Sequence, residues 1–346
     1  MITSDSTPSM LTNDGSYHLS VIMPNYNHGR YIKKALEAML EQSLRPFELI
    51  VVDDCSTDDS VAIIEQCAER DPIIRLIRND KNVGPNIAIK RGVDLSTGDY
   101  LYLPAADDMV LPGFFEKMMA FIRERPQTKV CWSEPMIFYE ETGTFNRNQM
   151  FLSKMSAYFT PDDVATLYSS GYLTGLFCAN SAVMERTAYQ EAGGYIPELK
   201  AYGDGFMLLA LTFRYGLGYI PEVLTWQRVS TTPSYLLVVL DDKKDVRIIC
   251  KRILKLLHIP PHNELLGLVK RSGVLGAFQC SIMFIAEIII TPRYWRLASW
   301  AMIRRALWRH VKTMIMRSST SSMIFAYRRH RKWYRRMVRG YYDKAC

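Results

Sequence analysis

The chain has 346 residues, a formal net charge of +8 and 48% hydrophobic residues. This composition argues against wholesale disorder, and the length suits one large domain with an appendage, or two domains. Seven cysteines without a C-x-x-C pair argue against a disulfide framework or a zinc cluster and favour a reducing cytosol.

The first half of the chain alternates short apolar runs with segments of helix formers. Strands are expected at 19–24, 47–53, 73–77, 100–103 and 130–133, and helices at 31–42, 58–70, 85–95 and 112–124. This alternation predicts an α/β fold with a doubly wound, mostly parallel sheet and helices on both faces. Ligands of such sheets bind at the carboxyl ends of the strands.

Two polar clusters follow the first two predicted strands. Pro24 and Tyr26 lie in a Pro-Asn-Tyr-Asn segment, which could place an aromatic ring against a nucleobase or form an ordinary turn. Asp53 and Asp54 follow the second strand, where a carboxylate could accept the imide N–H of uracil or bond ribose hydroxyls. The alternative is a capped helix start, with Ser56 or Asp58 as the cap; capping does not explain the two acids before it.

Asp107 and Asp108 follow the strand expected at 100–103. Adjacent carboxylates repel each other unless a cation offsets their charge, so the pair predicts a divalent metal site. The alternative is a solvated loop in which one of them caps the helix near Pro112. Asp204, between two glycines, could be a general base or the N-cap of the helix expected at 204–215.

The order and spacing of these clusters resemble the family 2 glycosyltransferases of the glycosyltransferase A (GT-A) fold. The resemblance covers about residues 19–228 and lies in VIMPNYNHGRYI, ELIVVDDCSTDDS, NVGPNIAIKRGVDLSTGDYLYL, AADDMVLPGF, AGGY, YGDGF and YIPEVLTWQR. It implies a catalytic domain at residues 17–232, after a disordered lead at 1–16. It also implies an inverting transfer of sugar from a nucleotide sugar to a hydroxyl group, and uridine diphosphate sugars are the expected donors.

The resemblance also implies roles for individual residues. The nucleotide sugar would be held by Pro24, Tyr26, Asp53, Asp54, Asp107 and Arg228, a surface salt bridge being the alternative for Arg228. Mg²⁺ or Mn²⁺ would bind Asp108 assisted by Asp107, and Asp204 would be the base. The chain departs from the family pattern at Ala105, where many members have a further acid, and at Gly203, where the acid that often precedes the base is missing.

Residues 233–346 are expected to form a helical, basic region. Residues 293–346 contain fifteen Lys and Arg against one acid, Asp343. The predicted helices at 294–317 and 323–342 mix cations with tryptophans and aliphatic residues, which is typical of a helix lying in a membrane interface. A subdomain packed on the catalytic body and a nucleic-acid-binding tail are the alternatives, the latter without a recognised nucleic-acid fold.

The apolar segment 273–291 is nearly long enough to cross a bilayer. Gln279, Ser281 and Glu287 interrupt it, so a buried or membrane-surface helix is expected rather than a span. Together these features predict a cytoplasmic enzyme at the inner face of the cell membrane. Its acceptor would be a glycan or a lipid-linked glycan of surface-polysaccharide synthesis.

Two other functions share parts of this pattern. A non-catalytic, membrane-associated binding or scaffold protein with a decayed donor site would account for Ala105 and Gly203. A nucleotidyltransferase would share the sheet and the acids, but it usually has a glycine-rich phosphate loop near the N-terminus, which we do not find in this sequence.

Overall fold

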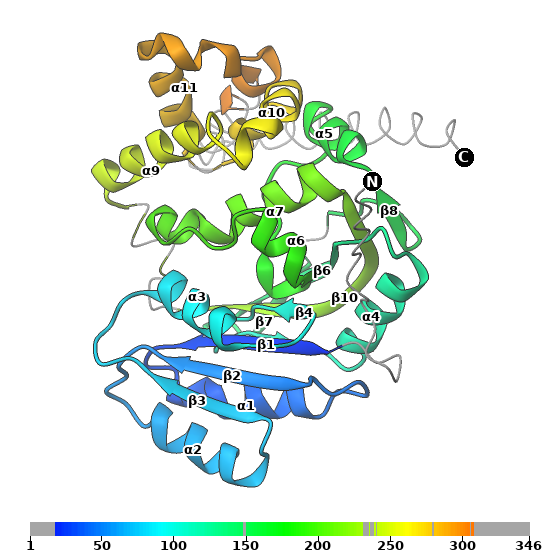
Figure 1. Cartoon of the computed structure of the whole chain (residues 1–346), viewed down its shortest axis with the longest axis vertical. Coiled ribbons are helices and arrows are strands. Elements are labelled where there is room, and N and C mark those ends of the chain that lie inside the picture. The colour runs from blue at the N-terminus through cyan, green and yellow to red at the C-terminus, as the bar shows by residue number, and fades with distance from the viewer. Residues whose placement is uncertain are drawn as a thin grey trace, which may run out of the picture.

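The computed structural model describes residues 18–307 apart from 148–149, 231–234, 236–238, 240, 279 and 305. The disordered lead expected at 1–16 and most of the basic tail lie outside the described residues. The described chain forms a mixed sheet with helices on both faces and a helical layer stacked on one side (Figure 1).

The first half of the chain consists of strand–helix units that follow one another as the sequence predicts. They are β1 (Leu19–Asn25), α1 (Gly29–Leu40), β2 (Glu48–Asp53), α2 (Ser60–Arg70), β3 (Ile74–Arg78), α3 (Pro85–Leu95) and β4 (Tyr100–Tyr102). In α1 the buried positions Ile32, Ala35, Leu36 and Met39 recur at helical spacing, so one face of the helix enters the core.

The second half contains strands that the sequence analysis did not predict. Its elements are β5 (Met109–Val110), α4 (Phe114–Glu124), β6 (Val130–Tyr139), β7 (Thr144–Arg147), β8 (Ala157–Phe159), α5 (Pro161–Ser169), β9 (Ala182–Glu185), α6 (Arg186–Glu191), α7 (Gly203–Tyr215) and β10 (Leu217–Val229). The strand expected at 130–133 continues to Tyr139, and β10 runs over 13 residues beside it.

The strand order is β3-β2-β1-β4-β9-β6-β10-β5. The expected parallel pairing holds from β3 to β4 and between β6 and β10. Strand β9 is antiparallel to both β4 and β6, and β5, β7 and β8 also pair in antiparallel fashion. The α/β fold is as predicted, whereas the sheet is mixed: it is parallel from β3 to β4 and between β6 and β10, and antiparallel at its other pairings.

Alternate residues of each central strand enter two different cores. In β1, Val21 and Met23 pack with α1 and α4, whereas Ile22 packs on the opposite face with residues of α3 and α7. Figure 1 shows α1 and α2 on one side of β1–β3 and α3, α6 and α7 on the other. This layering brings the carboxyl ends of β1, β2 and β4 to one edge.

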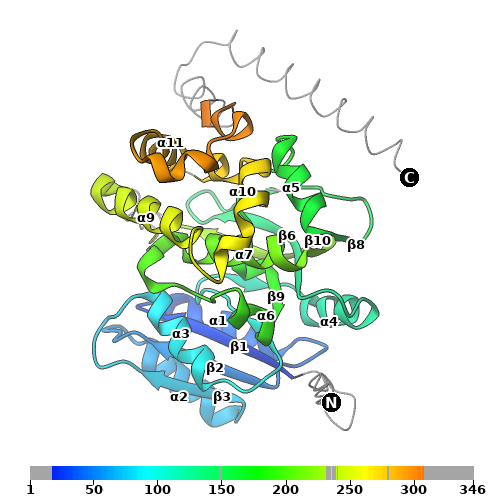
Figure 2. The ribbon, with the colours of Figure 1, turned by 45° about the horizontal axis from the view of Figure 1, so that its top comes forward.

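The C-terminal helices α9 (Lys243–Leu256), α10 (Leu266–Ser272) and α11 (Ser281–Ile290) stack beyond α7 (Figure 2). Their buried residues join the same hydrophobic core as α7, with Phe206 and Ile249 as examples from the two layers. This core runs from the expected catalytic domain into the C-terminal helices, so it marks no domain boundary between residues 232 and 233. The domain division expected there stays a prediction.

The apolar segment 273–291 is interrupted rather than continuous. A short 3-10 turn at Val274–Ala277 precedes α11. Within the described ranges, we find no helix with the length and apolar character needed to cross a membrane. Glu287, which we expected to disfavour a span, is only 1% exposed and pairs with Arg247 and Lys251 of α9.

Removing both cations opposite Glu287 should destabilise the fold. Arg247→Ala with Lys251→Ala leaves a buried carboxylate without its partners, and we expect a loss of about 3–5 kcal/mol in the free energy of unfolding. Adding Glu287→Leu should recover most of that loss. Urea denaturation measures it, with Lys243→Ala plus Lys255→Ala as the control of equal charge. Equal stability of the two double variants would contradict the prediction.

Candidate active site

Asp53 organises the loops that follow β1 and β2. Pro24 and Asn25, which we expected in a loop, are the last residues of β1, and Asn25 stands opposite Asp53 in the parallel pairing. The Asp53 carboxylate is 1% exposed and accepts hydrogen bonds from Asn25 Nδ2 at 2.7 Å, Ser56 N at 3.0 Å and Ser56 Oγ at 2.6 Å. Its position is thus set by the protein's own donors.

Asp54 holds the loop that leads into α3. Its Oδ1 accepts from Asn79 Nδ2 at 2.8 Å and from Val83 N at 2.9 Å, and its Oδ2 accepts from Gly84 N at 2.7 Å. A carboxylate oxygen can accept two hydrogen bonds, so Oδ2 keeps room for one more donor. Gly84 has a φ of 88°, a conformation in which side chains other than glycine's are strained.

Tyr26 follows β1 directly and its side chain is exposed. The neighbouring Asn27 joins the two loops, because its Oδ1 accepts from Thr57 N at 2.8 Å and its N–H donates to Ser56 Oγ at 2.9 Å. The N-cap of α2 is Asp59, so neither Ser56 nor Asp58 is the cap that the alternative proposed. The Asp58 carboxylate accepts from Gly29 N at 2.8 Å and from Ser60 N at 3.0 Å, the first residues of α1 and α2.

Asp108 lies at the junction of three chain segments. It is 8% exposed, and its two oxygens accept from Asn180 Nδ2 and from the backbone N–H of Arg228, both at 3.0 Å. Burial, together with the negative charge of Asp107, holds the pKa of Asp108 well above its usual range. Neither acid caps α4, which begins after Gly113, so the capping alternative is wrong.

Asp107 is the more accessible member of the pair. It is partly exposed, and within the described chain its carboxylate makes no hydrogen bond or ion pair. A free carboxylate beside a buried one whose charge is disfavoured fits a divalent cation. Mg²⁺ in particular is usually held by one or two carboxylates and the substrate's phosphates. No group of three His, Cys, Asp or Glu side chains forms a ready metal site in the ranges that the structure describes.

Arg228, at the end of β10, packs against the acidic loop and forms a salt bridge that is largely buried rather than on the surface. Its side chain is 12% exposed, its guanidinium lies 4.3 Å from the centre of the Tyr31 ring, and it pairs with Glu140 at 3.3 Å. Its Nε donates to the backbone oxygen of Asp107 at 3.2 Å. The cation is therefore fixed next to the two acids.

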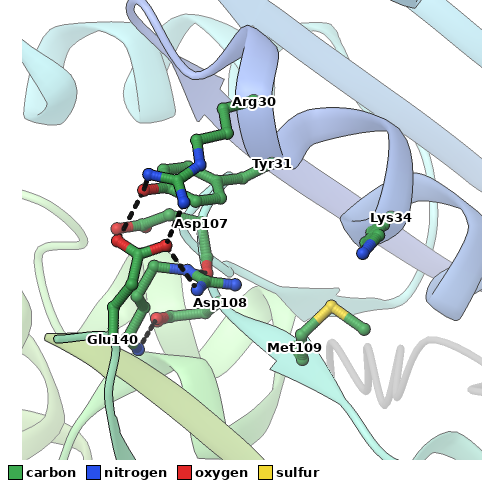
Figure 3. A pocket seen from close by; sticks show the side chains of 8 residues that line it. Arg30, Tyr31, Lys34, Asp107, Asp108, Met109 and Glu140 are labelled. Carbon is green, nitrogen blue, oxygen red and sulfur yellow. Dashed lines mark hydrogen bonds and ion pairs between the residues drawn. The ribbon is translucent and has the colours of Figure 1, made fainter. Parts of the chain in front are cut away.

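A pocket of about 140 Å³ opens beside Asp107 (Figure 3). It is bounded by the start of α1, the acidic loop, β5 and the first residue after β6. The residues that line it are Arg30, Tyr31, Lys34, Asp107, Asp108, Met109, Glu140 and Arg228.

Asp204 lies in the first turn of α7, where it is partly buried. Burial raises the pKa of its carboxyl to about 6, although Gly205 N donates to Oδ1 at 2.7 Å. The N-cap position is Tyr202, so the capping alternative for Asp204 is wrong. A Cβ on Gly203 would lie 2.6 Å from Asn86 Nδ2, so this glycine lets α3 and α7 approach closely.

Cys178 lies within electrostatic reach of both Asp204 and Asp108. Burial, together with the nearby carboxylates of Asp204 and Asp108, raises the pKa of its thiol to about 12. Both acids are thus close enough to act on the charge of one side chain. The metal-site candidates and the base candidate, 96 positions apart in the sequence, therefore line one region of the fold.

Sequence analysis missed several residues that shape this site. Asn180 holds Asp108, Glu140 pairs with Arg228, and Asn86 Nδ2 donates to Lys200 O at 2.7 Å, joining α3 to the turn before α7. These contacts join segments far apart in the chain, and no local pattern signals them. Of Asn86, Glu140 and Asn180, Asn86 alone lies in a segment that carries the family resemblance, NVGPN.

Comparison with known proteins identifies the family. The model of "Glycosyl transferase family 2" matches residues 20–192, half of the chain. An uncharacterized glycosyltransferase of Escherichia coli, YibD, is 38% identical over 31% of this chain and 30% of its own length. The putative teichuronic acid biosynthesis glycosyltransferase TuaG of Bacillus subtilis is 34% identical over 31% of this chain and 42% of its own. The matches thus span less than half of either relative.

Two solved structures share the fold at low sequence identity. S. aureus TarS 1-349, solved in complex with UDP-GlcNAc, has a TM-score of 0.59 at 16% identity, covering 81% of this chain and 79% of that one. The mannosyltransferase PcManGT of Pyrobaculum calidifontis, solved with GDP-Man and Mn²⁺, has a TM-score of 0.54 at 15% identity, covering 91% and 85%. With the family model matching half of the chain and the GT-A fold in place, this chain belongs to glycosyl transferase family 2.

Proposed function

We propose that this chain is an inverting glycosyltransferase that moves a sugar from a nucleotide sugar, with a uridine diphosphate sugar as the donor, to a hydroxyl group. The observation that carries the proposal is the acidic pair, in which Asn180 and Arg228 hold Asp108 while Asp107 stays accessible beside Arg228. It supports a donor site there, and Asp204 in the first turn of α7 supplies a separate carboxylate as the base. The TarS structure with UDP-GlcNAc is a precedent for such a donor in this fold.

The nucleotide would bind across the ends of β1 and β2. Tyr26 offers an exposed ring for the base, Pro24 precedes it at the end of β1, and Asp54 Oδ2 has capacity for the imide N–H of uracil. Asp53 would support this site by shaping the loop, since its carboxylate already accepts three hydrogen bonds.

The ribose and diphosphate would lie against the acidic loop, with Mg²⁺ or Mn²⁺ held by Asp108 and Asp107. Asp107 has the unengaged carboxylate, and Ala105 leaves these two acids as the loop's metal ligands. When bound, such an ion offsets the negative charge that develops on the leaving diphosphate. Arg228, fixed beside Asp107, would add a second positive charge there.

Asp204 would act as the general base. Its carboxylate removes the proton from the acceptor hydroxyl, whose oxygen attacks the anomeric carbon as the bond to the diphosphate breaks, with inversion. No adjacent acid is present at Gly203, but burial raises the pKa of Asp204 to about 6. A base with a pKa near the working pH removes protons efficiently while staying largely ionised.

Replacing the base tests the proposal directly. Asp204→Asn should lower the transfer rate by about 10²–10⁴-fold, the usual contribution of general base catalysis, while the affinity for the donor stays unchanged. Transfer is measured as release of UDP in the presence of Mn²⁺, and donor binding by calorimetry. Asp162→Asn, an exposed acid on α5, is the matched control.

The same experiment separates the enzyme from a non-catalytic scaffold with a decayed donor site. A scaffold binds nucleotide sugars without turnover, so wild type and Asp204→Asn would be equally inactive. Full activity of Asp204→Asn would show instead that another group is the base.

The pH dependence of transfer should follow Asp204. The base works only when deprotonated, so kcat/KM should be level above pH 6 to 7 and fall about tenfold per pH unit below pH 6, because the pKa of Asp204 is raised to about 6. A pH–rate profile with the donor below its KM measures this. A level profile down to pH 4.5 would contradict the assignment.

The acceptor would be a glycan or a lipid-linked glycan of surface-polysaccharide synthesis at the cytoplasmic face of the membrane. The name of TuaG places one relative in teichuronic acid biosynthesis. The C-terminal layer supports a membrane partner, because α11 exposes Ile282, Ile289 and Ile290 and the following turn exposes Trp295. Arg293 and Arg296 are exposed in the same turn. Apolar side chains beside cations suit an anionic lipid surface.

Ile289→Ser with Ile290→Ser should weaken binding to anionic vesicles by about tenfold or more, because each exposed isoleucine would lose apolar burial in the lipid. Co-sedimentation with phosphatidylglycerol vesicles measures this. Met155→Ser, at an exposed apolar residue of the catalytic half, should bind like wild type. If the double variant binds vesicles as well as wild type does, this face of α11 does not contact the membrane. If wild type does not bind either, the protein has no affinity for this lipid surface and the membrane partner is wrong.

A further inference from the structure

The pocket beside Asp107 is too small for a whole donor. Its volume of about 140 Å³ lies below the roughly 300–1,000 Å³ of typical small-molecule sites. It therefore suits one substituent of a larger substrate that extends out of the opening.

The lining residues favour an anionic substituent. Three cations border the pocket: Arg30, Lys34 and Arg228. Lys34 is exposed and takes part in none of the ion pairs found in the described ranges. Three carboxylates also border it, so the empty pocket is balanced in charge, and a divalent ion on the acidic pair would make it positive.

Glu140 shows what the pocket can hold. This single carboxylate accepts a hydrogen bond from Tyr31 OH at 2.8 Å and pairs with Arg30 at 3.2 Å and with Arg228 at 3.3 Å. Figure 3 shows it reaching in from the strand side to meet the two α1 residues. Glu140 follows β6 directly, and its backbone N–H is bonded to Val229 O at 2.9 Å, so its side chain alone would need to move.

Arg228 does not depend on Glu140 for its position. Its Nε donates to Asp107 O at 3.2 Å, and the rings of Tyr31 and Trp226 lie 4.3 and 5.1 Å from its guanidinium. Phosphate oxygens that replaced the Glu140 carboxylate would meet a guanidinium that is already in place. Little conformational freedom would be lost on binding, which favours affinity.

We propose that this pocket binds a phosphate group of a substrate, and that Glu140 is an internal competitor which leaves when the phosphate enters. Arg30, Lys34, Arg228 and Tyr31 OH are its donors, and Arg30 and Lys34 are positioning residues for the transfer. The proposal rests on the proposed function, because the phosphate is either the donor's diphosphate or a phosphate carried by the acceptor. A phosphate group has three strong acceptor oxygens, whereas a carboxylate has two. Phosphate can therefore accept more hydrogen bonds from these residues than Glu140 does.

Calorimetry on the full chain with Mg²⁺ at constant ionic strength tests the exchange. UDP and uridine are the donor probes, and glycerol 3-phosphate added to UDP-saturated protein is the acceptor probe. Lys34→Ala should weaken phosphate binding about three- to tenfold and Glu140→Gln should strengthen it by a similar factor, the effect of a partly exposed charge pair. Lys33→Ala, which changes the neighbouring lysine outside the pocket, is the control.

The two probes distinguish the sources of the phosphate. If the variants change UDP affinity but not uridine affinity, the pocket holds the donor's diphosphate; if they change glycerol 3-phosphate affinity alone, it holds an acceptor phosphate. Affinities equal to those of Lys33→Ala for every probe, or weaker binding by Glu140→Gln, would overturn the proposal. If transfer is normal and Lys34→Ala and Glu140→Gln leave all affinities unchanged, the phosphate pocket is wrong and the proposed function stands. If the pocket binds phosphate but the protein transfers no sugar, the proposed function is wrong and the pocket stands.

Discussion

The buried carboxylate of Asp108 is the point on which the arrangement of this site depends. It joins the acidic loop to Asn180 before β9 and to the backbone of Arg228 at the end of β10. A buried charge is costly unless it is hydrogen-bonded, so these partners are needed for the loop to stay where it is. Their bonds leave Asp107 facing outward and set Arg228 beside it.

The carboxylates of the site divide into those that hold the protein and those that remain available. Asp53 and Asp58 are engaged by donors that include Asn25 of β1 and Gly29 of α1, and Asp54 is nearly so. Among the described residues, the carboxylate of Asp107 has no hydrogen-bond partner, and that of Asp204 accepts from the neighbouring Gly205 N–H. A sequence motif marks all five alike, because it records where acids occur and not which of their oxygens are free.

The elements of residues 19–124 other than β5 could be predicted because each is encoded locally, by apolar runs for the buried strands and by helical spacing for α1 to α4. Asp54 and the pair Asp107 and Asp108 follow β2 and β4, as expected, and their roles stay predictions. Strand β9 could not be predicted in the same way, since Val183 pairs with Tyr102 and Cys131, residues far away in the chain. Glu140 was missed for a related reason: it follows a strand that continues past the apolar run, and its partners lie on α1 and β10.

The hydrogen bond from Asn86 to the backbone of Lys200 joins α3 to the turn before α7. The same α3 begins at the loop that Asp54 holds, and Gly203 lets its first turn contact the helix that carries Asp204. In the proposed function, Asp54 would bind the nucleotide and Asp204 would be the base. A shift of the Asp54 loop on donor binding would then reach Asp204 through a single turn, and the enzyme would respond to its first substrate before it activates the second.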